Sequence, residues 1–175
     1  MSVAESFGVT ADQIDNLIDI HWPEWVAEAP DLKLVPASER LFDWLRKAPP
    51  TEADLVLRAL ARLSNDQADA GLVLAWVMMP AATVLAHRLR FMSEEIDEHV
   101  AAQLWIAVRT FPWSTTGRVA ANLKLNLRKN VVRDLTPTSS HLSLDESRLP
   151  PAEPQQAAIE ELIEILGDGL KAEVI

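Results

Sequence analysis

Apolar residues recur every three or four positions along most of this chain, the spacing at which one face of an α-helix is buried. The clearest series is Ile96, Val100, Leu104, Val108 and Phe111. A second series predicts a helix from about Arg118 to Leu135 and consists of Val119, Leu123, Leu127, Val131 and Leu135. No run of β-branched residues alternates with period two over the length of a strand. The pattern therefore predicts an all-α protein.

Capping residues and prolines predict where further helices begin and end. Thr10 with Gln13 forms a capping box, and Pro23 should kink or end the helix that follows. Other helix starts are predicted at Ser38, at Thr51 with Asp54, at Asn65 or Asp66, and at Ser93-Glu94-Glu95. Pro80 should kink or break a long apolar stretch at 68–90, and Pro112 should end the helix before it. We expect a compact bundle of about six or seven helices.

The same pattern divides the chain into four parts. Residues 1–64 are an N-terminal helical extension, and residues 65–136 are the helical body. Residues 137–154 are rich in Pro, Ser and Thr, which is typical of a linker. Residues 155–175 predict an acidic C-terminal helix, because apolar positions at helical spacing alternate there with glutamates.

Composition removes several classes of function. The chain has 0 Cys, which excludes a thiol nucleophile and a thiolate zinc site. A glycine-rich phosphate loop is absent from the sequence, and its histidines have no nucleophile at a recognised spacing. Glu95 and His99 have the spacing of two metal ligands, but no second carboxylate–histidine helix complements them. We therefore expect neither an enzyme nor a metal, cofactor or small-molecule site.

The predicted location is the cytoplasm. No apolar run approaches the roughly 20 residues that cross a bilayer, and the first residues lack the basic and apolar regions of a signal peptide. We therefore expect no membrane partner.

Charge is distributed unevenly along the chain. The net charge is -10, which by itself disfavours binding to polyanions. Residues 114–139, however, carry five bases and a single acid, whereas residues 140–175 carry eight acids and two bases. The basic segment coincides with the predicted helix at 118–135, which makes that helix the candidate anion-binding element.

The basic helix is also patterned. On a helical wheel, an arc of about 80° holds Arg118, Asn122, Asn126, Lys129 and Arg133. Lys124 and Arg128 flank the apolar side, and Trp113 precedes the helix in a loop. Cations can neutralise phosphates, Asn can pair with base edges, and an indole can stack on an unpaired base. The alternative is that the charged face is simply solvated and that Trp113 packs against the core or the loop.

These segments resemble region 2 of the bacterial sigma factors, nearest to the extracytoplasmic-function type, over residues 66–135. Two stretches carry the resemblance, EEIDEHVAAQLWIAVRTFP at 94–112 and RVAANLKLNLRK at 118–129. It implies that the first helix docks on the clamp helices of the largest RNA polymerase subunit, with Asp97 and Gln103 as contact residues. The family's usual Gln-Glu pair falls on Ala101 and Ala102. Trp113 and the basic helix would then hold the opened non-template strand of a promoter.

Two functions follow as hypotheses. The first is a DNA-directed transcription regulator or sigma-factor-like protein that binds promoter or single-stranded DNA, with RNA polymerase or another transcription protein as a further partner. The alternative is a helical protein-interaction module, such as an adaptor or anti-factor, that has a sigma-like fold and does not bind DNA.

The acidic C-terminal segment generates a testable prediction. If its negative charge shields the basic helix, removing residues 151–175 should strengthen binding to single-stranded DNA, because phosphates would no longer compete with carboxylates. Titration of the full and shortened chains against one labelled oligonucleotide at fixed salt measures the difference. An unchanged affinity would contradict the shielding hypothesis.

Overall fold

Helices account for nearly all of the regular structure in residues 2–136, the part of the chain that the computed structural model describes. The elements in chain order are α1 (Val3–Phe7), α2 (Ala11–Glu28), the 3₁₀ helix η1 (Pro30–Leu34), α3 (Leu41–Lys47), α4 (Pro50–Ser64), α5 (Ala68–Arg88), α6 (Ile96–Arg109) and α7 (Val119–Leu135). Because residues 2–136 contain no strand, the all-α prediction is confirmed. The predicted linker at 137–154 and the predicted acidic helix at 155–175 lie outside the described residues.

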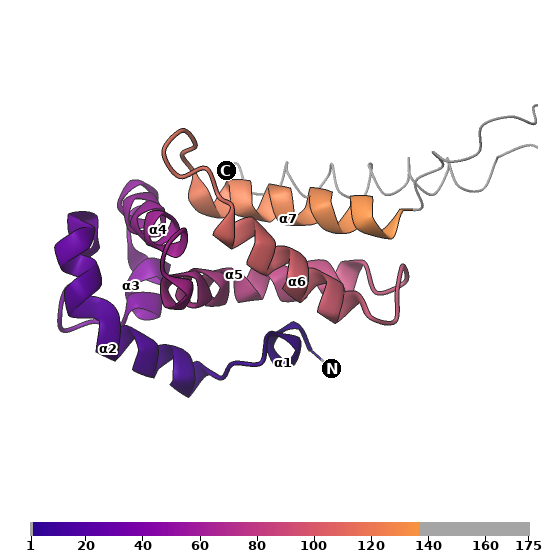
Figure 1. Ribbon diagram of the computed structural model, residues 1–175, viewed down its shortest axis with the longest axis horizontal. Helices are drawn as coiled ribbons and strands as arrows, with labels where there is room; N and C mark the ends of the chain where they lie inside the picture. The colour runs from indigo at the N-terminus through magenta and orange to yellow at the C-terminus, as the bar shows by residue number, and fades with distance from the viewer. Residues whose placement is uncertain (1, 137–175) are drawn as a thin grey trace, which may run out of the picture. The chain divides into compact units, whose positions relative to one another are not determined.

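The long helix α5 lies at the centre of the bundle (Figure 1). It contacts α1, α2, α4, α6 and α7. Ten of its residues are buried, and they include Val73, Leu74 and Ala75, which are 0% exposed. The apolar composition of this segment therefore reflects its contacts on several sides.

Two helices cross α5 with their apolar stripes turned toward it. All five residues of the stripe predicted for α6 are buried. In α7 the first four residues of the stripe are buried and Leu135 is half-buried. The helical periodicity thus correctly indicated which faces of α6 and α7 point into the core.

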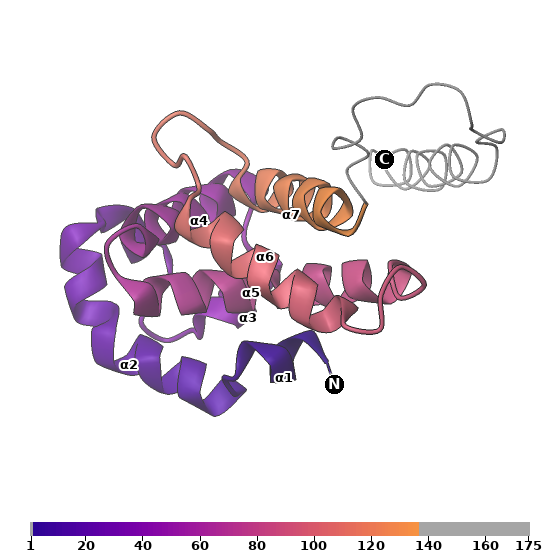
Figure 2. The ribbon, with the colours of Figure 1, turned by 45° about the vertical axis from the view of Figure 1, so that its right-hand side comes forward.

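Residues 1–64 pack onto the same core. Residues 2–136 form one compact unit, and the predicted N-terminal extension belongs to it. Helix α1 contacts α5 and α6 and buries Val3 completely. Figures 1 and 2 show α1 and α7 on opposite sides of the α5–α6 pair. The bundle therefore presents two separate helical surfaces.

The sequence analysis did not predict α1, although its boundaries are marked. Ser2 and Glu5 form a capping box, in which the Ser2 backbone N–H donates to Glu5 Oε2 at 2.7 Å. Gly8 ends the helix with φ 71°, a left-handed conformation that glycine adopts without steric cost. Both signals can be read from the sequence, so a search for capping boxes near the N-terminus would have found this helix.

Neither internal proline ends its helix, so of the two outcomes predicted for Pro23 and Pro80, a kink or an end, the end is wrong. Helix α2 continues through Pro23 to Glu28, and α5 continues through Pro80 to Arg88. Contacts to α5 fix α2 on both sides of Pro23, since His21 lies 3.1 Å from Asp69 and the Trp25 indole donates to Gln67 at 2.5 Å. These contacts and the complete burial of Trp25 offset the hydrogen bond that proline removes.

Three predicted helix starts are also wrong. Helix α3 follows Arg40, α4 begins at Pro50 and α5 follows Gln67, and none of the three has a side-chain cap. Proline at the first position of α4 has no N–H group to satisfy, and its fixed φ suits the first turn of a helix, so α4 can begin at Pro50. Burial of the apolar faces sets these boundaries in place of capping.

Helix α5 is more apolar over its length than the sequence analysis expected of any segment. By length and composition, α5 is long and apolar enough to cross a membrane, contrary to the sequence expectation. Within the bundle, 56% of its most apolar window is buried, and packing alone accounts for that composition.

The packing of α6 predicts a large difference between two of its neighbouring apolar residues. Replacing Leu104, which is 0% exposed, by Ala should lower the free energy of unfolding by about 2–5 kcal/mol because it leaves a cavity. Ile106→Ala is the matched control, since Ile106 is 46% exposed and its truncation should cost far less. Urea denaturation followed by circular dichroism measures both, and equal losses would contradict this packing of α6.

Candidate nucleic-acid interface

The buried stripe of α7 determines which of its side chains face solvent. Val119, Leu123 and Val131 are 0% exposed and Leu127 is 1% exposed, so one face of the helix is fully covered. Arg128 is half-buried beside this face. The exposed cations of the candidate interface are Arg118, Lys124, Lys129 and Arg133. The geometry thus leaves most of the predicted cations accessible to a ligand.

The beginning of α7 is held by a carboxylate from another helix. Asp54 of α4 accepts hydrogen bonds from the backbone N–H groups of Arg118 (to Oδ2, 3.0 Å) and Val119 (to Oδ1, 2.6 Å). Residues of α7 itself supply no side-chain cap. Asp54 therefore satisfies two of the N–H groups that a helix start leaves without partners, and its charge favours the positive end of the helix dipole.

Arg118 forms the backbone turn at the start of α7 and also carries a positive charge. It has φ 51° and ψ 57°, the left-handed region, which costs a non-glycine residue on the order of 1–2 kcal/mol. The two hydrogen bonds to Asp54 form at this turn and offset that cost. Arg118 thus sets the direction in which α7 leaves the loop, while its side chain stays exposed.

Trp113 lies in an internal packing site. Arg58 of α4 fixes the backbone of the loop, donating from Nε to the Trp113 carbonyl at 2.8 Å and from Nη2 to the Ser114 carbonyl at 3.1 Å. The Arg62 guanidinium lies 5.7 Å from the indole centroid. When the Asn65 amide is oriented so that its oxygen and its nitrogen both form hydrogen bonds, the oxygen accepts from Trp113 Nε1 at 2.7 Å and the nitrogen donates to the Arg109 carbonyl at 3.2 Å. Trp113 is half-buried, and these contacts already occupy its Nε1 group and part of its ring surface.

The two asparagines of the predicted arc differ in their environment. The Asn122 amide nitrogen donates to the Gly117 carbonyl at 2.6 Å and to the Arg118 carbonyl at 3.3 Å, so it stabilises the turn into α7. Asn126 is exposed and forms no side-chain hydrogen bond within residues 2–136. Only Asn126 of this pair has an amide available for a base edge.

Arg128 is joined by a cation that the sequence analysis did not single out. Burial, together with the positive charge of Arg88 at the end of α5, lowers the pKa of Arg128. Lys124 lies one turn before Arg128 on the same side of α7. Among the described residues, neither Arg88 nor Arg128 forms an ion pair. Arg88 and Arg128 therefore lie near each other where α5 packs on α7, and Lys124 extends this positive charge by one turn along α7.

A second row of cations follows the outer side of α7. Lys129 and Arg133 are exposed and one turn apart. Arg133 Nε lies 3.5 Å from Asp134 Oδ1, and its side chain is 66% exposed, so this pair is weak and easily exchanged for another anion. We define the α7 cationic surface as Arg88, Lys124, Arg128, Lys129 and Arg133.

The residues that the resemblance assigns to polymerase contact lie on α6. Gln103 donates from its amide to Asp134 of α7, so this group links two helices of the bundle. Asp97 is half-buried in the first turn of α6. Helix α1 packs on the same helix, and Ala101 is 5% exposed. The small side chains of Ala101 and Ala102 thus permit the close approach of α1.

A cluster of metal-ligating side chains is not found in the described part of the chain. Residues 2–136 contain no group of three His, Asp or Glu side chains placed to hold a metal ion. Glu95 and His99 are both exposed. The candidate site is therefore a surface that can bind an anion by charge and shape.

No protein-family model, curated protein or solved structure significantly matches this chain.

Sequence reasoning missed Arg88 and Asp54 as parts of this site. Arg88 belongs to a helix far earlier in the sequence, and its proximity to Arg128 results from the packing of α5 against α7. Asp54 was expected to cap its own helix. The sequence contains no local signal that pairs either residue with α7.

The cap of α7 generates a stability prediction. Asp54→Ala should lower the free energy of unfolding by about 1–2 kcal/mol, because two backbone N–H groups at the start of α7 lose their acceptor. Glu24→Ala removes a carboxylate from an exposed position of α2 and serves as the control. If both variants unfold at the same denaturant concentration, Asp54 does not anchor α7.

Proposed function

We propose that this protein binds nucleic acid through the α7 cationic surface, by contact with the phosphate backbone. The observation that carries the proposal is the row of exposed cations on the outer face of α7, together with the closeness of Arg88 and Arg128 where α5 packs on α7. Like charges near one another repel, a bound anion would relieve that repulsion, and neither arginine forms an ion pair within the described residues. A phosphate chain supplies anions at regular intervals and matches two rows of cations along one helix.

The geometry favours contacts that do not depend on sequence. Arg and Lys bind phosphate oxygens, and Asn126 is the single predicted asparagine whose amide is available for a base edge. Leu125 is 56% exposed between the two cation rows, where it can pack on an unstacked base or a thymine methyl group. Because Trp113 is held in the loop, the affinity for nucleic acid should come mainly from contacts with its phosphate backbone.

The role in transcription rests on the resemblance to sigma region 2. In that proposal, the protein is a DNA-directed transcription regulator whose α7 holds single-stranded or promoter DNA. RNA polymerase or another transcription protein would be its further partner. The Gln103–Asp134 contact and the packing of α1 on α6 mean that polymerase docking would use other exposed residues of α6.

A second candidate function is a helical protein-interaction module. It is favoured by the exposure of Val84 (50%) and Leu125 (56%), because an apolar residue next to cations also suits an acidic amphipathic helix. Val84 lies one turn before Arg88 on α5, and Leu125 lies between cations on α7. Each of these two helices therefore exposes an apolar residue beside basic ones. Salt dependence and competition by DNA distinguish the two functions.

The decisive experiment measures DNA affinity against salt. A labelled single-stranded oligonucleotide should bind with an affinity that falls steeply as salt rises, and each lost phosphate contact should reduce the logarithmic slope by about 0.7. The double variants Arg88→Ala with Arg128→Ala, and Lys129→Ala with Arg133→Ala, should each reduce it by about 1.4.

The matched control removes two exposed cations from α3. Arg46→Ala with Lys47→Ala makes the same change in net charge away from α7 and should leave the slope nearly unchanged. If all three double variants behave alike, the binding is a nonspecific effect of net charge. If the folded protein fails to bind DNA at low salt, the protein-interaction function is preferred.

A further inference from the structure

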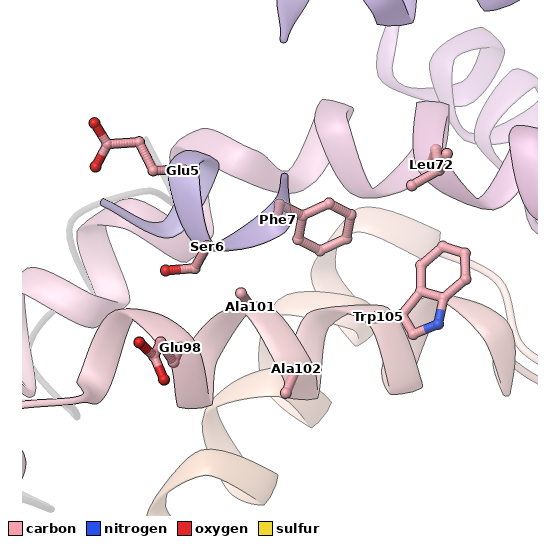
Figure 3. Close-up of a pocket in the computed structure, with 8 residues that line it drawn as sticks. All are labelled: Glu5, Ser6, Phe7, Leu72, Glu98, Ala101, Ala102 and Trp105. Carbon is pink, nitrogen blue, oxygen red and sulfur yellow. The ribbon is translucent and has the colours of Figure 1, made fainter. Parts of the chain in front are cut away.

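A groove lies between α1 and α6, apart from the α7 cationic surface. Figure 3 shows the eight residues that line it, which are Glu5, Ser6, Phe7, Leu72, Glu98, Ala101, Ala102 and Trp105. Its volume is about 600 Å³, and it opens to solvent. Because α1 and α7 lie on opposite sides of the α5–α6 pair, a ligand here would not compete directly with one on α7 (Figure 2).

The two ends of the groove differ in chemistry. At one end Glu5 and Glu98 are exposed carboxylates, and the hydrogen bond from the Ser2 backbone lowers the pKa of Glu5, which keeps it charged. At the other end Phe7, Leu72 and Trp105 form an apolar wall (Figure 3). The groove is therefore polarised from acidic to aromatic.

The aromatic end is held in a fixed arrangement. Phe7 meets Trp105 edge to face, with ring centroids 6.1 Å apart. Arg109 lies 5.5 Å from the Trp105 centroid and donates to the Ser64 carbonyl, so it is anchored to α4. A Cβ atom at Gly71 would lie 3.3 Å from both Trp105 and Arg109, so glycine gives this pair its space. A preformed aromatic wall binds a ligand at a lower entropic cost than a mobile one.

The floor of the groove permits the close approach of another helix. Ala102 is the open part of this floor, since Ala101 is only 5% exposed, and a small residue lets a neighbouring backbone come near. Ala102 is exposed, and one turn later Ile106 is 46% exposed. The Ser6 hydroxyl oxygen is buried beside this floor and forms no hydrogen bond within the described residues. Together these features make an unpartnered apolar face with a hydrogen-bonding group at its edge.

We propose that this groove docks a basic amphipathic helix from another protein, with an apolar side chain against Trp105 and a Lys or Arg at Glu98. Charge complementarity selects this occupant. Glu94 and Glu95, just before α6, add negative charge beyond the acidic end, and this repels phosphates and acidic peptides. The protein would then use opposite charges on opposite sides, with nucleic acid on α7 and a basic partner on the α1–α6 groove.

The test uses synthetic peptides and the full chain. A helix-forming peptide with leucines on one face and lysines on the other should bind, whereas the peptide of equal length with glutamate in place of lysine should not. Ala102→Arg fills the groove and adds a cation, so it should lower the affinity for the basic peptide roughly tenfold or more. Ala27→Arg is the control, because it makes the same change at an exposed position of α2.

Each outcome bears on the proposal. Isothermal titration that shows the loss for Ala102→Arg and not for Ala27→Arg supports it, as does a flatter salt dependence for Glu98→Gln. Failure of the basic peptide to bind at low salt would overturn it, and so would equal losses in both arginine variants. Binding of the acidic peptide with the same affinity would also overturn it. Circular dichroism verifies that the variants fold, and unchanged DNA binding by Ala102→Arg separates this result from the function of α7.

Discussion

Burial of α5 is the interaction on which the other helices depend. Helices α1, α2, α4, α6 and α7 all contact it, and several of its side chains have no exposed surface. A helix that is apolar on most sides cannot be stable in water by itself, so its neighbours gain their positions by covering it. The same burial explains why α2 and α5 continue through prolines, since their neighbours hold the chain on both sides.

The position of α7 follows from this core. Its apolar stripe packs inward, and Asp54 anchors its first N–H groups, so its outer residues face solvent in a fixed direction. Packing against α5 then brings Arg88 to Arg128 and produces a local excess of positive charge in a protein of net charge -10. A fixed cluster of cations binds a polyanion better than the same charges dispersed, because counterions are released together.

The bundle also separates chemistry by side. The α7 cationic surface lies on one side of the α5–α6 pair, and the polarised groove beside α1 lies on the other (Figures 1 and 2). Two ligands of opposite charge can therefore bind without contact with each other. Helix α6 contacts both sides, since Gln103 donates to Asp134 of α7 and Trp105 lines the groove beside α1.

The sequence by itself determined the helical class, the buried stripes of α6 and α7, and the outward direction of Asn126, Lys129 and Arg133, because helical periodicity is a local property. Only the tertiary structure decided that Arg58 holds the loop at Trp113 and that Asn122 stabilises the turn into α7. It also decided that Asp54 caps a helix other than its own and that Arg88 lies near Arg128. The physical reason is range. A stripe depends on neighbours three or four residues away, whereas these contacts depend on which helices pack together, and burial of α5 determines that packing.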